Sequence, residues 1–173
     1  MDFGAIQCTP QSPDCLFCPL SVGCSALSKG LVTVLPVKQH KTKSTNRYFN
    51  YIYVRAGAYT FINKRTADDI WKNLFELPLI ETSVALSEEE FLALPEFREL
   101  VAEGEKPVVV RSVCREVKHV LSHRVIYANF YEVILPEGTA SFGKFQKIKA
   151  EELERYAVSR LVHAFIEKYI DLK

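Results

Sequence analysis

The chain has 173 residues, of which 48% are hydrophobic and 25% are charged, and its formal net charge is +1. This length supports one core of ordinary size plus a small appendage, and the apolar content is that of a globular protein, which excludes an intrinsically disordered chain. No apolar run approaches the ~20 residues that a membrane helix requires, so we expect no membrane partner.

Charge is distributed unevenly along the chain. From Lys29 to Lys72 there are nine basic residues and two acidic ones, whereas from Glu76 to Glu105 there are nine glutamates and one arginine. A basic block can follow a phosphate backbone, which would repel the acidic block. Charge alone does not separate this interpretation from a solvated basic edge that binds no partner.

Four of the five cysteines lie close together near the start of the chain, with the spacing C-x6-C-x2-C-x5-C. They are Cys8, Cys15, Cys18 and Cys24. Because three prolines interrupt this short loop, it can fold back so that four thiolates face one centre, which suits a tetrahedral zinc ion or an iron–sulfur cluster. Structural zinc sites usually present two close cysteine pairs, but here only Cys15 and Cys18 form such a pair, which favours a 4Fe-4S cluster.

Disulfide bonds are the alternative for these cysteines. They need an oxidising compartment, yet no positively charged start followed by an apolar export segment precedes Cys8. The fifth cysteine, Cys114, lies far away in the sequence and has no obvious mate. Unpaired thiols indicate a cytoplasmic protein, and Cys114, which sits in an apolar β-branched run, is expected to be a small buried hydrophobic residue.

The first part of the chain predicts little regular structure. Residues 2–7 are expected to form the last turn of a helix that begins ahead of Met1, and the segment after Cys24 is expected to be helical and to end at Gly30. A polar, basic segment with Pro36 then predicts a linker. The predicted division is an end of a helical domain, a linker and a C-terminal domain, over residues 1–28, 29–43 and 44–173.

The third part predicts an α+β domain, because strands are followed by helices, further strands and a final helix. Alternating aromatic residues predict a strand over 48–55, and Gly57 turns it into a second strand over 59–63. Residues 70–78 form a short apolar segment that ends at a proline.

Later elements of this domain are marked by caps and by β-branched residues. Ser87 and the three glutamates after it predict the start of a helix that ends near Leu94. Ser159 caps a predicted amphipathic helix. The expected ranges are a second helix over 96–103, a break over 104–107, strands over 108–120 and 124–135, an edge strand over 145–148 and the final helix over 159–169.

The residues at 1–5 and the four cysteines, with Leu16 and Phe17 between them, resemble the end of the helical domain in MutY-type adenine DNA glycosylases. The cysteine spacing is the iron–sulfur signature of the wider family of helix-hairpin-helix glycosylases and endonuclease III. Residues 35–38 resemble the MutY connector, and the sequence Leu-Phe-Glu-Leu-Pro at 74–78 resembles the family's L-W-E-F-P segment. The resemblance implies a Nudix-like mixed β-sheet with flanking helices, preceded by a short cysteine-rich iron–sulfur loop from a helical domain.

The segment from Lys118 to His123 lies where one predicted strand passes into the next, at an exposed turn. It resembles the H-x-F-S-H or H-x-F-T-H motif of MutY C-terminal domains: His119, Ser122 and His123 match, and Leu121 replaces the phenylalanine. Without this resemblance, two histidines satisfied at a strand end would be the favoured interpretation. In the family the serine reaches the oxidised guanine, so the resemblance implies nucleic-acid contacts for His119, Leu121, Ser122 and His123.

The chemistry of the lesion agrees with a serine at this turn. In 8-oxoguanine, N7 carries a proton and donates a hydrogen bond, whereas N7 of guanine only accepts one. A hydroxyl can accept that proton. Since it can also donate, Ser122 alone would discriminate incompletely and needs backbone groups or a second residue to fix its orientation.

The function implied by the resemblance is that of an adenine DNA glycosylase, which removes adenine mispaired with 8-oxoguanine in base excision repair and holds a 4Fe-4S cluster. In the family a glutamate and an aspartate of the helical domain catalyse the reaction on a flipped adenine. We therefore predict no catalytic residue in this chain and no activity of this part alone. The expected partners are double-stranded DNA containing 8-oxoguanine opposite adenine and the helical catalytic domain ahead of Met1.

Two other functions remain open. One is a zinc-binding adaptor with an α+β interaction domain. The other is a Nudix-type pyrophosphohydrolase, which carries G-x5-E-x7-R-E-U-x-E-E-x-G-U with glutamates that hold magnesium. Glu88, Glu89 and Glu90 are clustered, but the preceding glycine, the arginine and the closing glycine of that motif are missing, and compensation of a helix dipole accounts for the three acids.

Overall fold

The computed structural model describes residues 3, 6–9, 11–35, 44–102 and 109–170. The chain divides into two compact units, which we call the cysteine unit (residues 1–43) and the sheet unit (residues 44–173). The predicted break over 104–107 and most of the predicted linker lie outside the described residues. None of the described helices is both long and apolar enough to cross a bilayer.

The cysteine unit contains little regular structure among its described residues. A short 3-10 helix, η1, spans Ser21–Gly23, and a single helical turn, α2, spans Ser25–Ser28. Gly30 then takes the left-handed conformation, with φ of 64°, so the predicted helix after Cys24 and its stop are confirmed in outline. Every described residue of this unit is exposed or half-buried, so the unit has no hydrophobic core among them.

The sheet unit contains, in its described residues, a sheet of seven strands in the order β3-β2-β1-β6-β5, with β4 paired to β1 and β7 paired to β2. The long central strands β1 and β6 are parallel along their whole length, and the other pairs are antiparallel. The strands are β1 Thr45–Ala56, β2 Tyr59–Lys64, β3 Phe75–Glu76, β4 Leu79–Thr82, β5 Val109–Val120, β6 Arg124–Leu135 and β7 Gln146–Lys149. This mixed sheet confirms the predicted α+β class.

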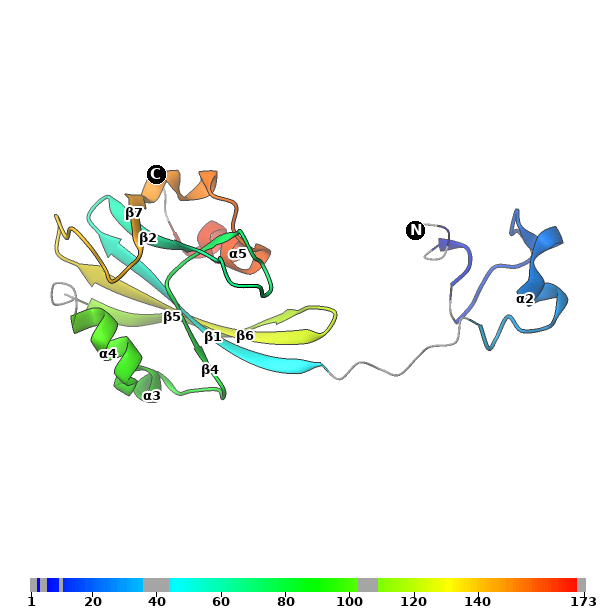
Figure 1. Ribbon diagram of the computed structural model, residues 1–173, viewed down its shortest axis with the longest axis horizontal. Helices are drawn as coiled ribbons and strands as arrows, with labels where there is room; N and C mark the ends of the chain where they lie inside the picture. The colour runs from blue at the N-terminus through cyan, green and yellow to red at the C-terminus, as the bar shows by residue number, and fades with distance from the viewer. Residues whose placement is uncertain (1–2, 4–5, 10, 36–43, 103–108, 171–173) are drawn as a thin grey trace. The chain divides into compact units, whose positions relative to one another are not determined.

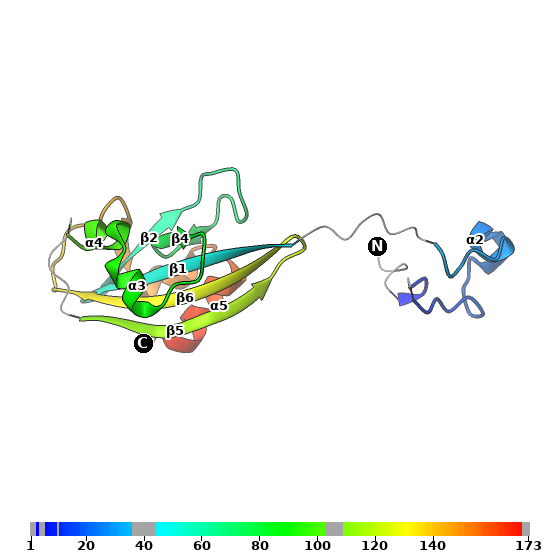
Figure 2. The same ribbon diagram turned by 90° about the horizontal axis from the view of Figure 1, so that it is seen from below.

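Helices cover both faces of the sheet (Figures 1 and 2). One face packs on α5, where Tyr51 of β1 stacks on Phe130 of β6, and Phe130 stacks on Phe165 of α5 with ring centroids 4.2 Å apart. The opposite face packs on α3 and α4, where Phe91 stacks on Tyr131 of β6. The helical elements are α3 Glu88–Ala93, α4 Pro95–Ala102, the 3-10 helix η2 Ala150–Arg155 and α5 Arg160–Tyr169.

The two faces follow from the period of the strands. Successive side chains of a strand point to opposite faces, so Phe49 and Tyr51 of β1 join the α5 side, whereas Ile52 and Val54 join the α3–α4 side. All four are fully buried. A strand that is apolar on both faces belongs in the centre of a sheet.

Most predicted elements are confirmed within a few residues, and two are not. The segment over 70–78 is not one continuous apolar element: it forms turns and the two-residue strand β3, and β4 begins immediately after it. In it, Trp71 and Asn73 have φ of 59° and 69°, conformations that non-glycine residues rarely adopt and that no sequence pattern marks. Strand β5 has register shifts between Ser112 and Val117, where an uninterrupted strand was expected.

The start of α3 offers a test of the predicted cap. The Ser87 hydroxyl accepts from the Glu90 amide at 3.1 Å, and the Glu90 carboxylate accepts from the Ser87 amide at 2.7 Å. Ser87→Ala is expected to lower the free energy of unfolding by about 1 kcal/mol, because the Glu90 amide in the first turn of the helix loses its partner. Urea denaturation of the chain measures this, with Ser83→Ala, at an exposed bend, as the control. Equal values for the two variants would contradict the assigned cap.

Candidate functional site

Leu121, Ser122 and His123 form the turn that joins β5 to β6, which we call the β5–β6 turn. The Leu121 amide donates to the Arg124 carbonyl at 2.8 Å, which closes the turn, and the Thr45 amide donates to the His123 carbonyl at 3.2 Å, which attaches the turn to the start of β1. Ser122 and His123 are exposed. The predicted exposed turn is therefore present, with a serine and a histidine at its tip.

The other two residues assigned to nucleic-acid contact are half-buried. The side chain of Leu121 packs against the core on the α5 side of the sheet. The imidazole of His119 lies edge-on to the indole of Trp71, with ring centroids 5.7 Å apart and an interplanar angle of 61°. Leu121, where the resembling motif has phenylalanine, thus packs towards the core and fixes the turn to the sheet.

A second loop braces this turn. Residues 65–74, which we call the 65–74 loop, are closed by hydrogen bonds from the Arg65 amide to the Leu74 carbonyl at 2.9 Å and from the Asn73 amide to the Arg65 carbonyl at 2.8 Å. Trp71 of this loop contacts the histidine that precedes the turn. Asp69 of the same loop pairs with Arg124, which follows the turn. One loop therefore contacts the β5–β6 turn on both sides.

Asp69 is the centre of a cluster of arginines that come from distant parts of the sequence. It pairs with Arg47 at 2.6 Å, with Arg65 at 3.1 Å and with Arg124. Arg47 also binds Glu81 at 2.6 Å. Partial burial alone would raise the pKa of Asp69, but hydrogen bonds from Arg124, from the Ile70 backbone and from Arg47 hold that pKa well below its usual range.

This cluster changes the interpretation of the basic block in the sequence. Arg47 and Arg65 belong to that block, yet both are largely buried and bind carboxylates, Arg65 also pairing with Glu76 at 2.7 Å. They brace the fold and are not free to follow a phosphate backbone. Basic groups that remain accessible beside the turn are Lys118, which is exposed, and Arg124, whose side chain is 37% exposed.

The four clustered cysteines line one pocket of the cysteine unit. Cys8 is exposed, the other three are half-buried, and none forms a disulfide. Desolvation and then repulsion by Cys24, Cys8 and Cys18 raise the pKa of the Cys15 thiol, so the four sulfur atoms act on one another electrostatically. A positive metal centre among them would reverse this effect and favour the thiolates.

Four cysteines bordering one pocket are a donor set that either a zinc ion or an iron–sulfur cluster can use. Within the part of the chain that the structure describes, no three Cys, His, Asp or Glu side chains lie close enough to share one metal ion. A 4Fe-4S cluster needs only that four thiolates border the same space, since each binds a different iron. The 4Fe-4S assignment stays a prediction.

The glutamates at the start of α3 serve the helix. Glu90 is committed to the capping box with Ser87, and these contacts lower the pKa of its carboxyl group. Glu88 and Glu89 lie in the first turn, where carboxylates stabilise the positive end of a helix. A local structural role therefore accounts for all three acids.

Comparison with known protein families identifies the fold. A family model for the NUDIX domain matches residues 50–168, which is more than half of the chain. The chain belongs to the NUDIX domain family, and its mixed sheet with flanking helices is the Nudix fold that was predicted.

Comparison with individual proteins finds adenine DNA glycosylases among the similar sequences. The adenine DNA glycosylase of Buchnera aphidicola subsp. Schizaphis graminum is 33% identical over 84 residues, 49% of this chain and 24% of that protein. The adenine DNA glycosylase of Buchnera aphidicola subsp. Baizongia pistaciae is 26% identical over 136 residues, 78% of this chain and 36% of that protein. The chain is a distant homologue of adenine DNA glycosylases and spans well under half of their length.

A solved structure agrees on the fold. The C-terminal domain of mouse MUTYH, crystallised in complex with human PCNA, superimposes with a TM-score of 0.54 at 18% sequence identity, covering 71% of this chain and 86% of that chain. At this identity the similarity concerns the fold alone.

The arginine cluster predicts a specific dependence of stability on pH. Because its folded pKa is lowered, Asp69 stabilises the fold above its ordinary pKa of ~3.9, and this contribution is lost as the pH falls through the folded pKa. Asp69→Asn is expected to cost about 2 kcal/mol near neutral pH and to make the loss of stability in acid less steep. Denaturation between neutral and acidic pH measures both effects.

Asp68→Asn is the matched control for this variant. The neighbouring side chain is 96% exposed and pairs only with Lys72, at 3.1 Å, among the described residues. An exposed pair of this kind contributes little to stability. If Asp68→Asn and Asp69→Asn changed the pH profile equally, the cluster would not have the stabilising role assigned to it.

Proposed function

We propose that this chain is the C-terminal part of an intracellular adenine DNA glycosylase that removes adenine mispaired with 8-oxoguanine. The observation that carries the proposal is the β5–β6 turn, where Ser122 and His123 are exposed on a NUDIX-family sheet related to adenine DNA glycosylases. In this role the sheet unit recognises the base opposite the target adenine.

Ser122 reads the lesion through the proton on N7 of 8-oxoguanine, which its hydroxyl oxygen accepts. Such a contact discriminates only if the serine cannot swing to donate to the N7 of guanine. The turn fixes the backbone that carries this hydroxyl, since Leu121 packs on the core and the 65–74 loop contacts both sides of the turn, and a second group at the DNA is needed to accept the hydroxyl proton. A reading group held by packing and by a surrounding shell of contacts keeps its geometry during binding.

Contacts to the DNA backbone set the register of this reading group and carry no sequence information of their own. Lys118 and His123 are exposed, and Arg124 is partly exposed beside them. We assign these three side chains to phosphates that flank the lesion. Arg47 and Arg65 are excluded from this task because both are largely buried among the carboxylates that bind them, whereas Arg124, although it pairs with Asp69, keeps 37% of its side chain exposed.

The cysteine unit is proposed to hold a 4Fe-4S cluster through Cys8, Cys15, Cys18 and Cys24. Since no described residue of this unit is buried, the cluster would stabilise it by tying four points of a short loop together. Several large apolar side chains of the unit are exposed, among them Leu16, Phe17, Leu20 and Val22. Such a surface suits packing against the helical catalytic domain, the partner proposed here.

The catalytic acids are assigned to that helical domain, so this chain supplies recognition and contributes no catalytic residue. The reading frame ahead of Met1 is expected to encode a helix-hairpin-helix and a downstream aspartate. This arrangement agrees with the share of the homologous glycosylases that the chain spans, 24% of one and 36% of the other.

The cofactor proposal is tested by metal analysis. The chain, prepared or reconstituted without oxygen, is expected to contain about four irons and as much labile sulfide, with a brown colour. Cys15→Ser should lower the iron content, whereas Cys114→Ser, which changes a cysteine of the sheet unit, should leave it unchanged. One zinc ion per chain and no iron would instead support the zinc-binding adaptor.

The recognition proposal is tested by Ser122→Ala. In the complete protein with its catalytic domain, this change is expected to lower the preference for 8-oxoguanine over guanine opposite adenine by about tenfold, the effect of one lost hydrogen bond. Adenine excision from the two duplexes measures the preference. Ser141→Ala, at another exposed serine, is the control, and an unchanged preference in Ser122→Ala would refute the role of this hydroxyl.

A further inference from the structure

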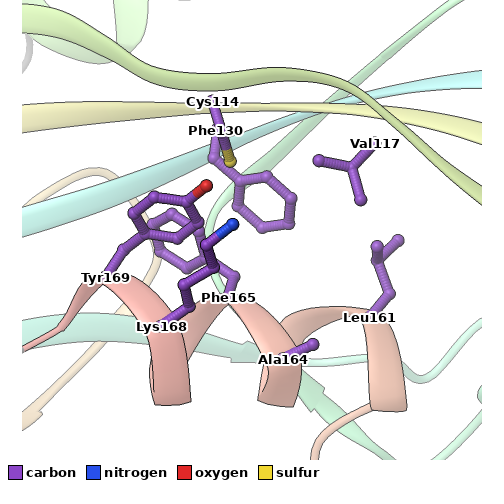
Figure 3. A pocket seen from close by; sticks show the side chains of 8 residues that line it. All are labelled: Cys114, Val117, Phe130, Leu161, Ala164, Phe165, Lys168 and Tyr169. Carbon is purple, nitrogen blue, oxygen red and sulfur yellow. The ribbon is translucent and has the colours of Figure 1, made fainter.

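A small pocket lies between β5, β6 and α5 in the sheet unit, with a volume of about 130 Å³ (Figure 3). Most of its wall is apolar and comes from the two strands on one side and the helix on the other. The lining residues are Cys114, Val117, Phe130, Leu161, Ala164, Phe165, Lys168 and Tyr169. None of them belongs to the β5–β6 turn or to the cysteine unit.

The bulge in β5 creates this pocket. Cys114 pairs with Phe130 and Val117 pairs with Ala128, so two residues of β5 stand opposite a single residue of β6. In a regular strand, residues three apart point to opposite faces, but the bulge turns both Cys114 and Val117 towards α5. Glu116, with φ of 55°, occupies the bulge.

Three polar groups converge at one side of the pocket. Figure 3 shows the sulfur of Cys114, the ammonium of Lys168 and the hydroxyl of Tyr169 pointing towards the same space. The Lys168 Nζ lies over the Tyr169 ring, 5.0 Å from its centroid, so the ammonium and the tyrosine are held side by side. No lining residue is acidic, so the pocket presents hydrogen-bond donors and one positive charge above an apolar floor.

Cys114 takes part as a thiol. Burial raises its pKa, although the Tyr169 hydroxyl and the Lys168 charge act in the opposite direction. A thiol that remains protonated near neutral pH is a poor nucleophile and a weak hydrogen-bond donor.

We propose that this pocket binds a small carboxylate that carries one aromatic ring or a compact branched hydrocarbon group. A cavity of about 150 Å³ lined by Leu, Ile and Phe takes up benzene, so the apolar part of this pocket matches one ring. The carboxylate then meets Lys168 and Tyr169 at the entrance, where a charge-assisted hydrogen bond is available. A neutral or cationic ligand of the same shape lacks that contact.

The proposal is tested with benzoate and benzyl alcohol as probes of one size and different charge. Each is titrated into the complete chain, and binding is followed by NMR chemical-shift changes. Benzoate is expected to bind about tenfold more tightly than benzyl alcohol, the effect of one hydrogen bond to a charged group. Lys168→Met should abolish this difference by weakening benzoate alone.

Two further variants separate the pocket from the rest of the surface. Ala164→Phe places a large ring at the exposed helix position beside the pocket and should abolish binding of both probes, while circular dichroism checks that the fold is retained. Lys149→Met, on β7 away from the pocket, should change neither affinity. Bound benzoate should also slow the alkylation of Cys114. Mass spectrometry of the peptide that contains Cys114 measures this rate.

Three results would overturn the proposal. One is the lack of binding of either probe to the folded chain. Another is equal weakening of both probes by Lys168→Met, which would remove the role of charge. The third is binding that survives Ala164→Phe and leaves Cys114 alkylation unchanged, which would place the probes elsewhere.

Discussion

The structure of the sheet unit depends on a buried pair of asparagines that connects its two central strands. Asn50 of β1 and Asn129 of β6 stand directly opposite each other, and the Asn129 side-chain amide donates to the Asn50 side-chain oxygen at 3.0 Å. Asn50 also donates to the Ile80 carbonyl of β4, and Asn129 accepts from the Glu116 amide of β5. Because a buried amide without partners is costly, any slip of one strand would break several contacts at once.

The register that this pair fixes determines both candidate sites. At one end it places Thr45 opposite Arg124, so the β5–β6 turn is held against the start of β1 and within reach of Asp69. In the middle, the bond from Glu116 satisfies the amide that the bulge leaves unpaired, so the bulge and the pocket beneath it persist. The position of the β5–β6 turn and the apolar pocket are thus two consequences of one strand pairing.

Local patterns in the sequence predicted the elements, and distant contacts decided the sites. Alternating aromatic residues marked β1, and serine caps marked α3 and α5 within a residue of their observed starts. In the Asp69 cluster, side chains that pair directly lie up to 55 residues apart in the sequence. No sequence motif or spacing predicts such a cluster. The sequence also gives no sign of the bulge at Glu116. Its left-handed φ occurs without a glycine and is stabilised by the side chain of Asn129 on the neighbouring strand.

The chain has the fold of the NUDIX family, but its clustered glutamates have a structural role in that fold. A NUDIX-family sheet is present, yet Glu90, one of the three clustered glutamates of α3, uses its carboxylate to cap that helix. A fold supports whatever site its loops and edges carry. Here the loop between β2 and β3 supplies Asp69 and Trp71, which hold a turn at the edge of the sheet. These contacts hold the turn in one place, and the proposed contact with a base depends on that rigidity.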